Sequence, residues 1–327
     1  PRGRITPRCL GLWNDEQVQA LIPITRFIEE MGSVPAMQLA HAGRKASARP
    51  PFHGGTPLDE EDAANGQAPW EVIGPCANGL GGIWPAPRAM TQRDIDDVIE
   101  AFVEATRRTI AAGFKVLEIH GAHGYLIQSF LSPISNQRND AYGGDLQGRM
   151  RFALELTEAV RQAWPQHLPL FFRISAVDGP TEGWSMDDSV TLSKALHKLG
   201  VDVIDCSSGG VLGPPRFRGD DAGKPFQSRT ARGPGFQVPY AERIKQQTDA
   251  LSMAVGVIVD PHQANDIIEA GQADLVALGR ELMYNPFWPL HAAQALDADA
   301  AFKHRPEQYG WAVEKRAGLA EFTGVRD

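Results

Sequence analysis

The chain has 327 residues, with 32 Lys and Arg against 40 Asp and Glu, so its formal net charge is −8. An apolar content of 43% excludes a disordered protein, and the acidic balance disfavours a dedicated nucleic-acid binder. No apolar stretch is long enough to span a membrane, and three scattered cysteines (Cys9, Cys76, Cys206) with no visible targeting segment predict a reducing, cytoplasmic location.

Helices with an apolar stripe alternate with short apolar strands along the whole chain. Asn14 with Gln17, Thr91 with Asp94, and Ser185 with Asp188 form the expected helix-start signals. The pattern predicts, in chain order, helix 15–31, strand 34–40, helix 91–112, strand 114–119, helix 146–164, strand 168–174, helix 186–199, strand 201–206, helix 239–248, strand 253–258, helix 261–270, strand 273–278 and a helix from residue 280.

The apolar, mostly non-alternating strands are typical of a parallel sheet covered on both faces. Two architectures are available, a TIM (β/α)₈ barrel and an open doubly wound sheet. We prefer the barrel because polar residues follow several strands and no Gly-x-Gly-x-x-Gly turn follows any strand. About six of eight units are visible, so we expect one domain over residues 1–327 that is N-terminally incomplete, unless two weak strands escape detection. Segments 43–90 and 208–237 are predicted to be long loops over the strand ends.

The sharpest motif is His-Gly-Ala-His-Gly-Tyr at residues 120–125, directly after a predicted strand. His120 and His123 can hydrogen-bond one carbonyl or phenolate oxygen, or they can ligate a metal. Tyr125 can supply a proton beside them. Two histidines at this spacing are more often surface residues whose hydrogen bonds are made within the protein. Their position at a strand end favours an active site instead.

Two further polar residues lie in or at the end of predicted strands. Gln38 carries an amide that both donates and accepts, which suits the edge of a heterocycle, although it can also cap its own loop. Arg173 lies in an apolar strand and therefore needs an anionic or strongly accepting partner. That partner is either a ligand or a carboxylate on a neighbouring strand, Glu118 or Asp205.

The last predicted strand ends in Gly279 and Arg280, where a helix begins. Barrels often bind phosphate after their last two strands, using backbone amides and a helix N-terminus. Gly256, after the preceding strand, adds amides to this position. The alternative is a simple turn glycine. A phosphate pocket here implies a phosphorylated substrate or a cofactor such as FMN.

Together these stretches resemble the old yellow enzyme family of FMN-dependent ene-reductases, and more narrowly its xenobiotic-reductase-like NADPH dehydrogenase branch. The matching stretches are Gln-Leu-Ala-His-Ala-Gly-Arg-Lys at 38–45, Glu-Ile-His-Gly-Ala-His-Gly-Tyr-Leu at 118–126, Ser-Asn-Gln-Arg-Asn-Asp-Ala-Tyr-Gly-Gly at 135–144, Arg149, Arg173 and Ala-Leu-Gly-Arg-Glu at 277–281. They cover most of the chain, in order, but two N-terminal strands of the family are lacking.

The resemblance implies a single FMN-binding barrel that takes hydride from NADPH and passes it to the β-carbon of an α,β-unsaturated carbonyl compound. Gln38 and Arg173 would contact the flavin ring, with Lys45 near it. His120 and His123 would hold the substrate carbonyl, with Tyr125 as proton donor.

It also implies that Gly256, Gly279 and Arg280 contact the flavin phosphate. Trp311 resembles a residue that approaches an active site, sometimes that of a neighbouring subunit, which predicts a homo-oligomer. Two alternatives stay open: a metal-dependent barrel hydrolase that uses His120 and His123 as ligands, and a truncated, flavin-free remnant.

Overall fold

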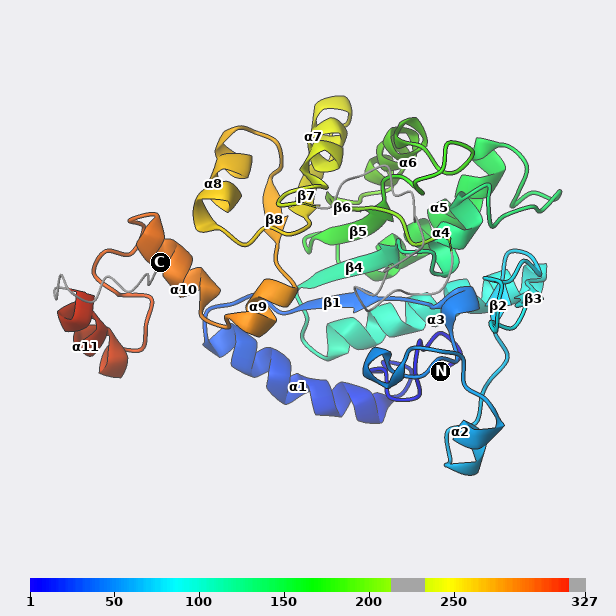
Figure 1. Cartoon of the computed structure of the whole chain (residues 1–327), viewed down its shortest axis with the longest axis horizontal. Coiled ribbons are helices and arrows are strands. Elements are labelled where there is room, and N and C mark those ends of the chain that lie inside the picture. Colours follow the sequence, from blue (N-terminus) through cyan, green and yellow to red (C-terminus); the bar gives the residue numbers. More distant parts are fainter. Residues whose placement is uncertain (213–232, 318–327) are drawn as a thin grey trace.

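The computed structural model describes residues 1–212 and 233–317. Within these residues one parallel sheet of six strands curves through the molecule, in the order β1-β4-β5-β6-β7-β8, with helices along its outer side (Figure 1). Its strands are β1 (Ala36–Leu39), β4 (Val116–Gly121), β5 (Leu170–Ser175), β6 (Val203–Ser207), β7 (Leu251–Val255) and β8 (Leu275–Ala277). Neighbours in this sheet follow one another along the chain, as in a barrel.

A helix lies in every crossover between these strands, because a parallel connection must return to the same end of the sheet. The crossover helices are α3 (Gln92–Ala111), α5 (Leu146–Ala163), α6 (Met186–Lys198), α7 (Val238–Gln247) and α8 (Pro261–Glu269). The remaining helices in the described residues are α1 (Asp15–Glu30), α2 (Glu60–Ala64), α4 (Leu126–Leu131), α9 (Arg280–Tyr284), α10 (Trp288–Ala295) and α11 (Glu307–Ala317), with 3₁₀ turns η1 (Gly43–Lys45) and η2 (Pro51–His53). All three predicted capping boxes are present.

The predicted fold class is confirmed, with six β/α units in the described part of the chain. Two predictions need correction. Segment 43–90 is more than a loop, since it contains η1, η2, α2 and a separate parallel pair formed by β2 (Ile73–Gly74) and β3 (Arg88–Ala89). Helix α4 was missed because all six of its residues are buried, so it has no polar face to give an amphipathic pattern. Residues 213–232 of the second predicted loop lie outside the described residues.

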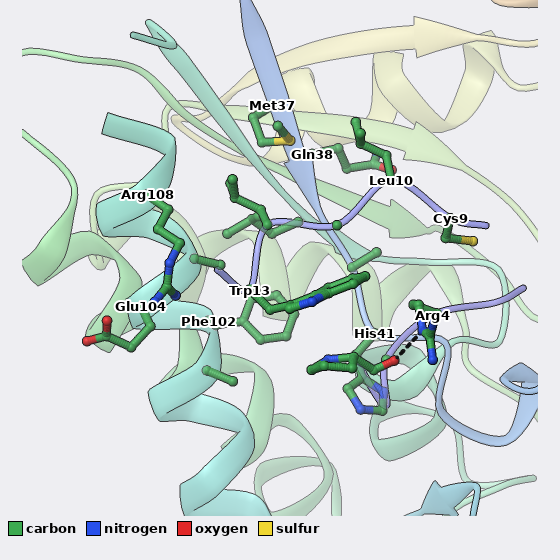
Figure 2. A pocket seen from close by; sticks show the side chains of 18 of the residues that line it. Arg4, Cys9, Leu10, Trp13, Met37, Gln38, His41, Phe102, Glu104 and Arg108 are labelled. Atoms are coloured by element: carbon green, nitrogen blue, oxygen red, sulfur yellow. Dashed lines mark hydrogen bonds between the residues drawn. The ribbon is translucent and has the colours of Figure 1, made fainter. Parts of the chain in front are cut away.

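A cavity of about 570 Å³ lies beside β1, an outer strand of the six-stranded sheet. Its walls come from β1, from N-terminal residues and from one face of α3 (Figure 2). Of the predicted site residues in the described part of the chain, Gln38 lines this cavity, whereas His120, His123 and Arg173 do not.

The described helices include none with the length and apolarity needed to cross a bilayer.

Candidate active site

The parallel register places five polar side chains on one face of the sheet. Gln38 of β1 lies opposite Glu118 of β4. Arg173 of β5 lies opposite His120 of β4 and opposite Asp205 of β6. Because residues two apart in a strand point to the same face, Glu118 and His120 share the face that carries Arg173. The sheet therefore gathers an amide, an imidazole, a guanidinium and two carboxyl groups.

Arg173 has a carboxylate partner, as one of its two interpretations predicted. Its Nε lies 3.3 Å from Oδ2 of Asp205, while the amide Nε2 of Gln38 donates to Oε1 of Glu118 at 2.5 Å. The side chain of Asp205 is 2% exposed, but that of Arg173 is 23% exposed. The ion pair therefore leaves part of the guanidinium accessible, so the two interpretations are compatible.

The structure brings the three rings of the 120–125 motif together. The ring centroids of His120 and His123 are 5.1 Å apart, and those of His120 and Tyr125 are 5.2 Å apart. His120 belongs to β4, whereas the other two lie on the turn into α4. Nδ1 of His120 is buried and has no hydrogen-bond partner among the described residues. A buried ring nitrogen without a partner is a candidate ligand contact.

Contacts from three other segments hold the turn that carries His123. Its backbone has φ +59°, and its amide donates to Oγ of Ser175 at 2.9 Å. Its Nε2 lies 2.6 Å from Oγ of Ser207. Nζ of Lys45 donates to the carbonyl oxygen of His123 at 2.7 Å and also to that of Gly210. Lys45, expected near a ring, thus fastens the histidine turn to the segment after β6.

We expect Gly124→Ala to destabilise the protein by about 3 kcal/mol, because strain and a collision act together. Gly124 has φ +71°, and a Cβ there would lie 2.2 Å from the backbone oxygen of Gly210. Urea unfolding measures the loss. Gly32→Ala is the matched control, since Gly32 has φ +80° with nothing within 4 Å of its Cβ position, and it should cost only about 1 kcal/mol. Equal losses in both variants would contradict the collision.

Burial sets the protonation of this cluster. It lowers the pKa of His123 to about 3 and that of His120 well below its ordinary value, and the charges of Arg173 and Lys45 act in the same direction. Burial raises the pKa of Tyr125 to about 12 and lowers that of Lys45 to about 7. At neutral pH both imidazoles are therefore uncharged hydrogen-bonding groups, and the phenol keeps its proton.

The predicted phosphate residues lie at the ends of the neighbouring strands β7 and β8. Gly256 has φ +128°, and a Cβ there would lie 2.9 Å from a ring carbon of Phe236, so packing already requires this glycine. Gly279 has nothing within 4 Å of its Cβ position, and Arg280 beside it is exposed. The helix after Gly279, whose N-terminal amides are predicted to bind phosphate, has five residues.

Trp311 is not brought to the histidine cluster within the chain. It lies on α11, which Figure 1 shows at the end of the molecule opposite α4. Its side chain is 57% exposed, and Nζ of Lys315 lies 4.5 Å from the ring centroid. The prediction that it serves a neighbouring subunit stays a prediction.

Sequence reasoning missed two hydroxyl groups. Ser175 and Ser207 end β5 and β6, face each other in register, and both contact His123. The sequence shows only that each serine follows an apolar strand, and this is weak evidence for a functional residue. The metal alternative finds no support, since the described residues contain no group of three or more His, Cys, Asp or Glu suited to an ion.

Comparison with known proteins places the sequence in one family. Residues 1–299 match the model of the NADH:flavin oxidoreductase / NADH oxidase family. The NADPH dehydrogenase of Geobacillus sp. strain WCH70 is 41% identical over 310 residues, which cover 95% of this chain and 80% of that protein. The NADPH dehydrogenase of Bacillus subtilis strain 168 is 36% identical over 313 residues, which cover 95% and 81%.

Solved structures agree on the fold. An old yellow enzyme homologue from Zymomonas mobilis has a TM-score of 0.67 at 23% identity, over 91% of this chain and 76% of that one. Morphinone reductase in complex with tetrahydroNAD has a TM-score of 0.65 at 21% identity, over 87% and 72%. The predicted resemblance and enzyme class are confirmed: the chain belongs to the NADH:flavin oxidoreductase / NADH oxidase family.

Proposed function

We propose that this chain transfers hydride from NADPH, through FMN, to the β-carbon of α,β-unsaturated carbonyl compounds. The observation that carries the proposal is the packing of His120, His123 and Tyr125, with ring centroids 5.1 and 5.2 Å apart, beside the strand that bears Arg173. FMN and NADPH as cofactors agree with the family match and with the NADPH dehydrogenases among its relatives. We also propose that residues 1–327 act as one FMN-binding domain.

The residues present fit a flavin. Arg173 keeps an accessible part of its guanidinium, which suits an anionic ring edge. Gln38 is exposed, and while one N–H of its Nε2 donates to Glu118, its carbonyl oxygen can accept from a ring N–H. Open space at Gly279 and the exposed charge of Arg280 suit a phosphate. These four residues, with the backbone of Gly256, would hold the cofactor.

When bound, FMN supplies hydride acceptance from NADPH and hydride donation to an electron-poor alkene. The uncharged imidazoles of His120 and His123 hydrogen-bond the carbonyl oxygen, where negative charge grows as the β-carbon is attacked. Oγ of Ser207 lies 2.6 Å from Nε2 of His123, and this hydrogen bond orients the ring. Tyr125, with its pKa near 12, holds a proton and gives it to the α-carbon.

The absorbance spectrum of the purified full chain, before and after adding FMN, tests this proposal. We expect flavin bands at about 450 nm, together with NADPH consumption that depends on 2-cyclohexenone. Bound zinc without flavin would instead favour the barrel hydrolase. If the protein binds neither flavin nor metal after reconstitution, the flavin-free remnant is the correct interpretation.

Tyr125→Phe is expected to lower kcat for an enone by about 10²–10⁴-fold, the usual worth of a positioned general acid. Flavin reduction by NADPH should keep its rate, since that half-reaction needs no proton at the α-carbon. Stopped-flow absorbance separates the two half-reactions. Tyr142→Phe, which removes a hydroxyl that donates to Glu155 outside the ring cluster, is the control. If both half-reactions slow equally in Tyr125→Phe, the role of the phenol is not proton donation.

We further propose a homo-oligomer in which Trp311 of one subunit reaches the site of another, based on its exposure on α11. Sedimentation velocity measures the state of assembly. Trp311→Ala should then raise KM for the enone without changing the flavin content. A monomeric, fully active protein would contradict this arrangement.

A further inference from the structure

Two carboxyl groups flank one guanidinium in the middle of the polar face of the sheet. Glu118 on β4 and Asp205 on β6 lie on either side of the strand that carries Arg173. Among residues 1–212 and 233–317, Arg173 is the one cation that faces them, so two ionised carboxylates would leave a net negative charge in a largely buried place. Such a charge is costly unless a proton neutralises it.

Each of these carboxyl groups has one oxygen with a polar partner and one oxygen without. One oxygen of Glu118 accepts from Gln38, and one oxygen of Asp205 faces Arg173. Their other oxygens, Oε2 of Glu118 and Oδ1 of Asp205, are buried and have no partner among the described residues. Each carboxyl group also shifts the pKa of the other, since Asp205 lowers that of Glu118 and Glu118 raises that of Asp205. Ionised carboxylates only accept hydrogen bonds, so one proton between them would satisfy both oxygens.

We propose that Glu118 and Asp205 share one proton and, as a pair with a single negative charge, position the guanidinium of Arg173. The pair is a positioning element, because Arg173, and neither carboxyl group, is the residue placed against the cofactor. The effect on the flavin rests on the proposed function, whereas the shared proton does not depend on it.

The groups that face Glu118 and Asp205 do not change charge in the pH range where the pair is expected to titrate. Gln38 faces it from β1 and Met253 from β7, and neither titrates. His120, on the same face of β4, stays uncharged because burial lowers its pKa, and Arg173 on β5 is the cation beside the pair. Burial raises the pKa of both carboxyl groups, that of Asp205 to about 7, against the opposing charge of Arg173. The shared proton should therefore be held up to neutral pH.

Unfolding of the full chain in urea at pH values from 5 to 8 tests the pair. A carboxyl group whose pKa is raised in the folded state stabilises the fold at low pH and loses that effect as pH rises. Relative to Asp205→Asn, the unfolding constant of the wild type should rise by up to about tenfold per pH unit as the pH approaches 7. Glu118→Gln should remove the same slope, because the remaining aspartate then faces Arg173 and an amide donor. Asp274→Asn, which alters an ion-paired carboxylate outside the cluster, should leave the slope unchanged.

Infrared spectroscopy gives a second measurement on the wild type alone. The carbonyl band of a protonated carboxyl group should be present at pH 6, weaken above pH 7, and disappear from the difference spectrum of either variant. A slope that survives in Glu118→Gln would mean that Asp205 titrates alone, and this would overturn the shared proton. Absence of the band in the wild type at pH 6 would do so as well. Neither measurement needs turnover, so a failure of enone reduction would leave the result unaffected.

The positioning role has its own readout in the flavin-loaded protein. Above pH 7 the wild-type cluster would gain a net negative charge, whereas Asp205→Asn, which keeps one carboxylate beside Arg173, stays neutral in that range. The midpoint potential of bound FMN should therefore fall more steeply with pH in the wild type than in Asp205→Asn. Parallel potentials in the presence of the infrared band would show that the pair is structural only.

Discussion

His123→Ala is expected to lower kcat/KM for an enone by about 10²–10³-fold, the usual loss when one donor to a developing oxyanion is removed. The same change should weaken the binding of a phenol to the oxidised enzyme while FMN stays bound. The reason is that His123 belongs to the ring cluster with His120, whereas the residues proposed for the flavin lie on β1 and β5 and just after β7 and β8. Phenol titration followed by absorbance, and the flavin content of the purified variant, measure the two effects.

A matched control keeps this result interpretable. His167→Ala removes an exposed imidazole outside the cluster and should change neither quantity. Ser207→Ala should give an intermediate loss, because it removes the partner of Nε2 but keeps the ring. If His123→Ala instead loses its flavin, the imidazole serves the cofactor and its assigned role is wrong.

Arg173→Met should abolish flavin binding and should also lower the free energy of unfolding by about 3–5 kcal/mol. The variant leaves Asp205, whose side chain is 2% exposed, without its cation. An isolated buried carboxylate is costly even where the intact ion pair adds little stability. Flavin content and urea unfolding at pH 8, where the carboxyl groups are most ionised, give the two measurements.

A double variant separates the two losses. Arg173→Met with Asp205→Asn leaves Glu118 as the one carboxyl group of the pair without its cation, so part of the stability should return while flavin binding stays lost. Arg173→Lys should keep most of the stability, since it retains the charge, but should bind flavin less well without the planar fork of donors. Full flavin binding in Arg173→Met would show that the guanidinium serves only the ion pair.

Local signals in the sequence were sufficient for most of the sheet and its crossovers. Asn14, Thr91 and Ser185 cap their helices as predicted, because a capping side chain bonds to backbone only three residues away. The motif at 120–125 was recognised for a similar reason, since its residues are close in sequence and one turn brings their rings together.

Other features had no local signature. The fully buried helix α4 shows no amphipathic period, and β2 and β3 have two residues each, too few for any pattern. The helix from residue 280 was predicted without an end, and its length of five residues depends on packing that the sequence does not show.

By itself the sequence determined the alternation of helices and strands, the barrel class and the residues with the chemistry of a flavin enzyme. Only the tertiary structure decided how those residues pair. It joined Arg173 to Asp205, placed Glu118 beside them, and held the His123 turn with Ser207 and Lys45. The physical reason is that these contacts depend on the register between strands distant along the chain. Register is fixed where the apolar faces of all the strands are buried together, and this requires the strands to be assembled.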